Sequence, residues 1–223
     1  MGIQNDALFF ISHIFDKLQK EQTSELSIFR PDDYDNYEDA WNEYETKFPS
    51  IIDKLFTGMS QKNISWNGCQ STNKIFETFT HITLELGTKN LEEAYYKDLF
   101  YEYHFETKCK NCGEKSKTET KEMIKLPEYL IFQINRYESK NKCKNKEFKE
   151  YPKRLKLRDK YESKRYLLNS FIIHEGDLKC GTYVAFWLKK DVWVKFDNSS
   201  FEVMQNFDEL QCQAYILFYK RLR

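Results

Sequence analysis

The sequence has no excess of either charge and no long hydrophobic run. Lysine plus arginine and aspartate plus glutamate both number 35, so the formal net charge is zero. A balanced chain has no long-range attraction to nucleic acid or to an anionic membrane. No apolar run approaches the roughly 20 residues that cross a bilayer as a helix. We therefore expect no nucleic-acid partner and no membrane partner.

The N-terminus also lacks the features of a targeting segment. Its first residues, MGIQNDALFF, contain no basic stretch ahead of an apolar one, as a secretory signal would. Asp6 stands where a myristoylation motif needs Ser or Thr. Without a secretory signal, the six cysteines are expected to be reduced thiols or metal ligands. These absences indicate an intracellular protein, in the cytoplasm, the nucleus or an organelle interior.

The composition is that of a folded chain. Hydrophobic residues make up 40% of the 223 residues and aromatic residues 17%, which is enough to bury one core. Lysines concentrate at residues 140–164. This segment favours a solvated loop that leads into an edge strand over a surface that stacks nucleic-acid bases.

An apolar helix is predicted at the N-terminus, starting near Gln4 and ending at Leu18. Asn5 or Asp6 would be its N-cap. The apolar residues at helical spacing are Ala7, Ile11, Ile14 and Leu18. The apolar residues that widen this stripe are Leu8, Phe9, Phe10 and Phe15. We therefore expect the first turns to be buried nearly all round.

Helical and strand-like patterns alternate along the rest of the chain. Helices are predicted at residues 38–56 and 90–103, and a half-buried strand at residues 75–86. After Leu126, strand-like runs dominate, namely YLIFQINRY, YLLNSFIIHE, TYVAFWLKK, VWVKFDNS and AYILFYKRL. The pattern predicts an α+β fold with a largely antiparallel C-terminal half.

Several of these segments resemble one enzyme family. The words CKNC, LPEYLIFQINRY, FIIHEGDLKCGTYVAFW, VWVKFDNSS and AYILFYKR, in this order, are similar to ubiquitin-specific proteases, which are papain-like deubiquitinating enzymes. IQNDALFFISHIFDKL is similar to the family's Gln-x-Asp-Ala-x-Glu-Phe helix, so the resemblance spans essentially the whole chain. It implies one domain of the papain-like fold, with incomplete thumb helices at 1–57, fingers at 58–125 and a β-rich palm at 126–223.

The resemblance implies that the catalytic centre has lost its base. Family members cut after ubiquitin's C-terminal glycine with a cysteine nucleophile, a histidine base and an Asp or Asn that orients the histidine. The histidine of the family's Gly-His-Tyr word corresponds to Thr182, whose hydroxyl cannot accept a proton at neutral pH as an imidazole can. Asp197 matches the orienting acid. Asn198 follows it and could donate a hydrogen bond toward an oxyanion, while His174 matches a separate, non-catalytic histidine.

The nucleophile is expected to be absent as well. The family's cysteine box, Gly-Asn-Thr-Cys, precedes the Gln-x-Asp word, and only three residues precede Gln4. Cys180 is close to Thr182 in sequence and is interpreted as a packing residue. No functional catalytic residue is therefore expected. Without the cysteine helix as a neighbour, the helix from Gln4 to Leu18 would leave apolar surface for a protein partner to cover.

The resemblance also identifies candidate residues for binding ubiquitin's C-terminal tail. Asp6 matches the family's tail-binding aspartate, and Phe9 replaces its glutamate. Losing that carboxylate would remove an ion pair with a tail arginine. Arg136, Tyr137 and Tyr183 match residues that line the tail channel. Core packing is the alternative interpretation for these three residues.

The zinc site of the family's fingers is predicted to be degenerate. Cys109 and Cys112 match the second Cys-x-x-Cys pair, whereas Trp66 and Cys69 align with the first. Tryptophan cannot ligate zinc, so a fourth ligand would have to come from elsewhere, and His81 and His104 are the candidates. We therefore expect no cofactor, with zinc lost or weakly held.

The sequence is compatible with three functions. The first is a catalytically inactive structural or interaction subunit of a larger assembly, and the second is a module that binds ubiquitin without cutting it. The third is an active cysteine-type deubiquitinase completed by a separate segment that carries the cysteine box. Thr182 disfavours the third, because a restored cysteine would still lack its base.

Overall fold

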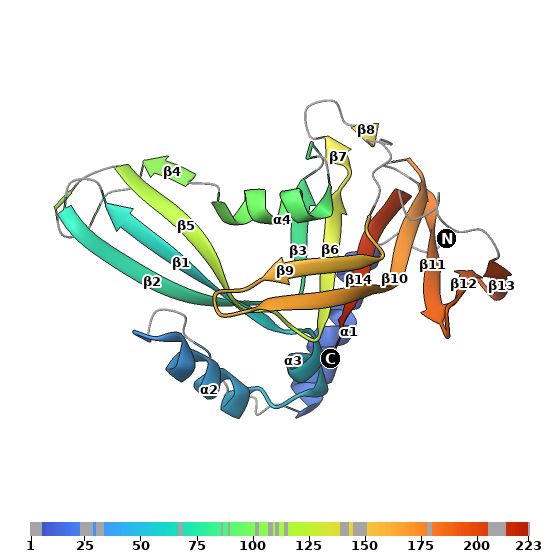
Figure 1. Cartoon of the computed structure of the whole chain (residues 1–223), viewed down its shortest axis with the longest axis horizontal. Coiled ribbons are helices and arrows are strands. Elements are labelled where there is room, and N and C mark those ends of the chain that lie inside the picture. The colour runs from blue at the N-terminus through green and yellow to red at the C-terminus, as the bar shows by residue number, and fades with distance from the viewer. Residues whose placement is uncertain are drawn as a thin grey trace.

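The computed structural model describes residues 6–22, 29, 34–66, 69–85, 87–88, 90–100, 103–106, 109, 112–113, 116–138, 143–144, 151–177, 180–204 and 213–222. The described helices are α1 (Ala7–Gln22), α2 (Tyr37–Lys47), α3 (Ile51–Phe56) and α4 (Leu91–Phe100). None of them is long and apolar enough to cross a membrane. They pack around two sheets that extend in different directions (Figure 1).

The smaller sheet is a long four-stranded extension. Its strands are β1 (Gly58–Trp66), β2 (Cys69–Phe79), β4 (Tyr103–Glu106) and β5 (Ser116–Lys125). Their order is β2-β1-β5-β4, all antiparallel, and they reach away from the rest of the molecule (Figure 1). The sequence pattern predicted only part of β2, because the other strands lack clear apolar alternation.

The larger sheet has eight strands. They are β3 (Ile82–Glu85), β6 (Tyr129–Asn135), β9 (Arg154–Arg158), β10 (Ser163–Gly176), β11 (Gly181–Lys189), β12 (Val192–Asp197), β13 (Ser200–Met204) and β14 (Ala214–Arg221). Their order is β13-β12-β11-β10-β14-β6-β3, with β9 paired to β10. All neighbours are antiparallel except β3 and β6. The predicted α+β fold with an antiparallel C-terminal half is therefore confirmed. A short ribbon joins β7 (Tyr137–Glu138) to β8 (Cys143–Lys144).

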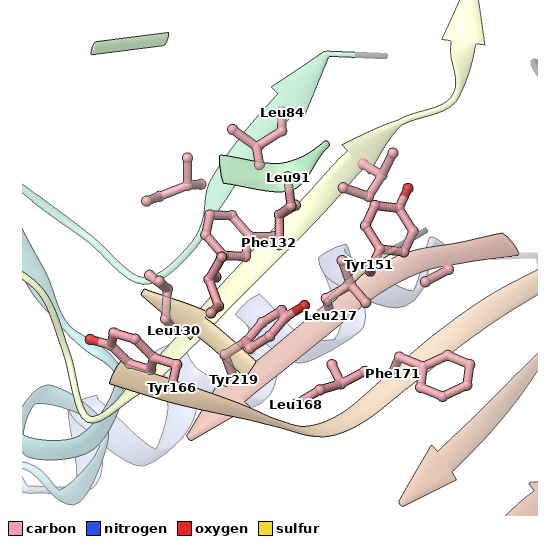
Figure 2. Packing of buried hydrophobic residues seen from close by; sticks show 14 of the residues in the cluster. Leu84, Leu91, Leu130, Phe132, Tyr151, Tyr166, Leu168, Phe171, Leu217 and Tyr219 are labelled. Carbon is pink, nitrogen blue, oxygen red and sulfur yellow. The ribbon is translucent and has the colours of Figure 1, made fainter. Parts of the chain in front are cut away.

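The main core lies between the larger sheet and α4. Alternate residues of β6, β10 and β14 point to this side, and Figure 2 shows Phe132, Leu168 and Tyr219 among them, with Leu91 of α4 close by. On β10 and β11, Phe171 and Phe186 stack with ring centroids 4.6 Å apart. Burial of such side chains contributes about 1.5–3 kcal/mol each, so this core stabilises the sheet.

Helix α1 packs on the opposite side of the sheet. The carboxylate of Asp6 accepts hydrogen bonds from the backbone N–H groups of Leu8 (2.8 Å) and Phe9 (3.1 Å), which identifies Asp6 as the N-cap. Leu8 packs against β6 and β14. Phe9 and Phe10 are 66% and 60% exposed. The expectation that the first turns are buried all round is therefore wrong for the described residues, because the sheet covers only one side of α1. Gln4 and Asn5 lie outside the described residues.

The predicted helix at residues 38–56 is split into α2 and α3. Pro49 separates them, because proline restricts the residue before it and has no N–H to donate. Each part has its own N-cap, Asn36 for α2 and Ser50 for α3.

A buried carboxylate joins these two helices to α1. Asp53 of α3 is only 4% exposed and accepts hydrogen bonds from Gln19 Nε2 of α1 (2.7 Å), Tyr44 Oη of α2 (2.5 Å) and Ser50 Oγ. Burial and the neighbouring Asp53 raise the pKa of Tyr44, so its hydroxyl stays a donor. Asp53 thereby holds α1, α2 and α3 together through charge-assisted hydrogen bonds.

Replacing Asp53 with alanine should lower the free energy of unfolding by about 3 kcal/mol. Hydrogen bonds to a charged group contribute about 1.5–3 kcal/mol, and the buried donors of Tyr44 and Ser50 would lose their acceptor. Urea unfolding of the purified protein measures this loss. Asp16→Ala is the matched control, because Asp16 is an exposed aspartate of α1 and its loss should change stability by less than about 0.5 kcal/mol. Equal effects of the two substitutions would contradict this role of Asp53.

Candidate functional site

A cluster of hydroxyl groups surrounds the carboxylate at the start of α1. Asp6 Oδ2 accepts hydrogen bonds from Tyr215 Oη of β14 (2.6 Å) and from Tyr183 Oη of β11 (3.3 Å). Tyr215 Oη in turn accepts from Gln133 Nε2 of β6 at 2.8 Å. The structure therefore brings together Asp6 and Tyr183, two of the predicted tail-binding residues.

Tyr215 was missed by the sequence reasoning. It lies in AYILFYKR, where it reads as one more apolar strand residue, and it is only 2% exposed. A tyrosine within an apolar strand was the one sign of a polar contact at this position, because a buried Tyr O–H normally has a hydrogen-bond partner. With Tyr215 and Tyr183 as donors on one oxygen and backbone N–H groups on the other, Asp6 is largely committed to contacts within the chain.

The position expected to hold the catalytic base is an exposed threonine on β11. Thr182 pairs with Glu175 across the β10–β11 ladder, and its neighbour Tyr183 pairs with His174. Cross-strand partners share a face and successive residues alternate. His174 and Thr182 therefore lie on opposite faces of the sheet.

His174 is occupied by packing on its own face. Its ring lies 4.8 Å from that of Tyr183, and the imidazole crowds the backbone of Gly181, where any Cβ would collide with it. This packing explains the glycine before Thr182. It also holds His174 away from the face of Thr182.

Asp197 matches the family's orienting acid. It comes directly after Phe196, whose pairing with Ala185 is the last between β12 and β11. Its Oδ1 accepts from Asn198 Nδ2 at 3.0 Å, and its Oδ2 lies 3.8 Å from Lys195 Nζ. Asn198 has a φ of 53°, a left-handed conformation that asparagine tolerates in tight turns. Asp197 and Asn198 thus shape the β12–β13 turn, and the described part of the chain places no imidazole against Asp197.

Arg136 and Tyr137 are the remaining candidates for binding the ubiquitin tail, and the structure describes the side chain of Arg136 but not that of Tyr137. Arg136 is 3% exposed, and its guanidinium donates to the Ala214 carbonyl (2.9 Å) and lies 3.4 Å from Tyr151 Oη. These contacts support the packing interpretation for Arg136. Tyr137 lies on β7, where its backbone pairs with Lys144, but its side chain is outside the description.

The candidate zinc residues converge on the far end of the four-stranded sheet. Trp66 of β1 pairs with Cys69 of β2 and with Lys117 near the start of β5. Cys109 and Cys112 precede β5, and the N–H of Gly113 donates to the Cys109 carbonyl at 2.9 Å, which closes a tight turn. The side chain of Cys69 is outside the described residues. Among those that are described, no group of three or more potential ligands is found.

The structure rules out His81, one of the two candidate fourth ligands. It comes two residues after the last residue of β2, whereas Cys69 is the first. At about 3.3 Å per residue, the strand separates them by roughly 35 Å, too far to share an ion. His104 pairs with Thr118 on β5, near the right end of the sheet, although its side chain lies outside the description. With Trp66 in a ligand position, the side chains that the structure describes do not complete a four-ligand site.

Elemental analysis of the purified protein should therefore find well under one zinc per chain. Structural zinc sites are normally closed by four positioned ligands, and a site with fewer ligands holds the ion weakly. Dialysis against a chelator should leave the far-ultraviolet circular dichroism unchanged. Stoichiometric zinc that survives dialysis, and that is lost in Cys109→Ser, would contradict this prediction.

Comparison with known proteins places this geometry in a family. The family model described as ubiquitin carboxyl-terminal hydrolase matches residues 1–219. The probable ubiquitin carboxyl-terminal hydrolase 8 of Schizosaccharomyces pombe is 24% identical over 173 residues, covering 75% of this chain and 38% of that protein. The ubiquitin carboxyl-terminal hydrolase nonstop of Drosophila melanogaster is 25% identical over 194 residues, covering 77% and 39%. The chain thus spans less than half the length of these two relatives.

Solved structures show the same fold over nearly the whole chain. A SAGA DUB module of Ubp8, Sgf11, Sus1 and Sgf73 bound to monoubiquitin matches with a TM-score of 0.74 and 22% identity, covering 99% of this chain and 49% of that one. A yeast SAGA DUB module with a mutant Sgf73 matches with a TM-score of 0.78 and 22% identity, covering 98% and 51%. Because the family model covers almost every residue, the chain belongs to the ubiquitin carboxyl-terminal hydrolase family.

Proposed function

We propose that this protein is a catalytically inactive member of its family and acts as a structural or interaction subunit of a larger assembly inside the cell. The observation that carries the proposal is Thr182, at the position where the family resemblance expects the histidine base. A cysteine nucleophile depends on a neighbouring base to form the thiolate. Neither the threonine hydroxyl nor His174, which faces the other side of the sheet, supplies that base.

An apolar surface on α1 supports the interaction role. Phe10 and Ile14 are 60% and 38% exposed, and Ile14 borders a pocket of about 270 Å³. The pocket is lined by Ile11, Ile14, Phe15, Phe56, Tyr129, Asn169, Ser170 and Phe218. Exposed apolar surface around a pocket marks a contact site for another protein segment.

A second apolar surface lies on the same side of the sheet. The register places Trp187, Val194 and Val203 in one row and Ala185, Phe196 and Phe201 in the next. Phe201 and Val203 are 74% and 58% exposed, and Trp187 and Phe196 about 40%. These rows share the face of Tyr183, which contacts Asp6 of α1. Together the two surfaces offer the extended apolar face that a stable subunit interface requires.

Affinity purification of the protein from its own cells tests the subunit role. A stoichiometric partner that stays bound through size-exclusion chromatography is the expected result. The solved SAGA DUB modules show that relatives occur in such complexes, with Ubp8 alongside Sgf11, Sus1 and Sgf73. Recovery of a well-behaved monomer with no partner would contradict the proposal.

A module that binds ubiquitin without cutting it is the second candidate. It is favoured by the retained Asp6–Tyr183 pair, and two of the solved relatives are bound to monoubiquitin and to ubiquitin aldehyde. In this candidate Asp6, Arg136, Tyr137 and Tyr183 would contact the ubiquitin tail. Phe9, 66% exposed in place of the family's glutamate, argues against it, because no carboxylate remains there for a tail arginine. Titration with ubiquitin, with Asp6→Ala as the comparison, separates the two candidates.

A further inference from the structure

One face of the β9–β10 hairpin carries exposed cations in regular rows. Along β9, Arg154, Lys156 and Arg158 are exposed and alternate with the buried Leu155 and Leu157. Successive side chains of a strand point to opposite faces. The two leucines therefore anchor β9 to the main core, and the three cations share its outer face.

Strands β10 and β14 extend this charged surface. Arg165 lies directly opposite Lys156, and Leu167 lies between Arg154 and Lys220 in the same row. We name these five cations, Arg154, Lys156, Arg158, Arg165 and Lys220, the basic face. Like charges directly opposite each other destabilise a sheet, so the pairing of Lys156 with Arg165 favours an external anion.

The described residues of the chain do not neutralise the basic face. The carboxylates beside the hairpin turn, Asp159 and Glu162, both pair with Lys164, at 3.0 and 3.3 Å. Lys164 is opposite the buried Leu157 and thus lies on the other face of β10. No carboxylate of the described residues lies within ion-pair distance of the basic face. With a net charge of zero for the whole chain, this excess of positive charge is local.

The outer edge of β9 is covered by α4 at Arg158 and is open at Lys156. The N–H of Arg158 donates to Tyr96 Oη and its carbonyl accepts from Tyr95 Oη, both at 3.2 Å, so the backbone of Arg158 points away from β10. The carbonyl of Lys153 accepts from the N–H of Leu168, so odd-numbered residues pair with β10. By alternation the N–H and C=O groups of Lys156 also point outward, and no described group bonds to them.

We propose that the basic face binds an extended acidic segment of a partner protein, which adds a strand to the outer edge of β9. Backbone hydrogen bonds to Lys156 would hold the added strand, as in other cases of strand addition. Same-face residues of any strand recur about every 6.6 Å. An acidic residue at every second position therefore places its carboxylates in register with Arg154 and Lys156, up to the point where α4 covers the edge at Arg158.

The same features disfavour a nucleic acid as the ligand of the basic face. Single strands bind by stacking bases on exposed rings. Tyr129, which pairs with Lys220 of the basic face, is covered by Lys220 Nζ at 5.4 Å and by Phe56, with ring centroids 5.3 Å apart. A phosphate backbone also lacks the alternating N–H and C=O groups with which a peptide pairs along the open edge of a strand. The inference stands on the β9–β10 hairpin and does not depend on the catalytic positions.

Fluorescence anisotropy of labelled peptides on the whole protein, at low and at physiological salt, tests the proposal. The probe is a ten-residue peptide of alternating glutamate and threonine, and its comparison has the same composition with the glutamates in one block. We expect the alternating peptide to bind at least fivefold more tightly than the block peptide. Lys156→Glu/Arg165→Glu should weaken it at least tenfold, because two attractive contacts become repulsive. Lys74→Glu, a single charge reversal at an exposed residue of β2, should have no effect.

Three results would overturn the proposal. The first is the absence of binding by the alternating peptide at millimolar concentration. The second is equal binding of the two peptides, which would show that charge alone and not strand register is recognised. The third is tighter binding of a 20-base-pair DNA or a single-stranded RNA that is also weakened in the double variant, which would assign the basic face to nucleic acid. Thermal unfolding of both variants confirms that they are folded, since every altered side chain is exposed.

Discussion

Replacing Phe10 or Ile14 with aspartate should release the partner protein while the chain stays folded. Both side chains are exposed on α1, Ile14 only partly, so the change itself should alter the free energy of unfolding by about 1 kcal/mol or less. At a buried interface the same change places an unpaired charge in an apolar site. A hot-spot residue contributes at least about 2 kcal/mol to binding, so the loss should be about thirtyfold or more.

Co-purification from the protein's own cells measures this release, and circular dichroism checks the fold of each variant. Lys20→Asp is the matched control, because Lys20 is exposed in the last turn of α1, about 15 Å from Phe10 along the helix axis. It should retain the partner. If Phe10→Asp and Ile14→Asp both keep every partner that the unaltered protein has, α1 is not the contact surface.

Thr182→His should produce the largest gain of activity available to this chain, once a nucleophile is supplied. The test protein is a chimera in which a family segment carrying the cysteine box precedes Gln4. With Thr182 the chimera should turn over a ubiquitin C-terminal reporter near background. With histidine at 182, turnover should rise by about 10²–10⁴-fold, the usual contribution of a positioned general base. Asp197 on the neighbouring β12 is available to orient the new imidazole.

Thr182→Ala in the same chimera is the control and should match the threonine version. This comparison separates the loss of the base from any defect of the fused segment. A chimera that is as active with Thr182 as with histidine would show that another group acts as the base. In that case the third function, an active enzyme completed by a separate segment, would replace the proposal made here.

Much of the fold could be predicted because the strands after Leu126 are buried on at least one face. β6, β11 and β14 carry apolar runs that fit such strands, and their order matched a known family. β1 and β5 were missed because half-buried polar residues such as Lys62 and Asn63 replace the expected apolar alternation. The split at Pro49 was visible in the sequence but was outweighed by helical spacing on both sides.

The candidate site was less predictable, because it depends on register. The sequence shows that threonine stands where a base is expected, but only the pairing of His174 with Tyr183 places that histidine on the opposite face. In the same way, Asp6 matched a tail-binding residue, whereas its hydrogen bond to Tyr215 joins residues 209 positions apart. Contacts at such separation leave no local pattern in the sequence.

The most direct test of the central claim is the reaction of the native assembly with a ubiquitin probe that carries a thiol-reactive C-terminus. The protein is purified from its own cells with every partner bound, incubated with the probe, and analysed by mass spectrometry of this chain. The account predicts no covalent adduct on any of its cysteines and no thiol-dependent turnover of a ubiquitin reporter. A stoichiometric adduct on this chain, accompanied by turnover that Thr182→Ala abolishes, would contradict it.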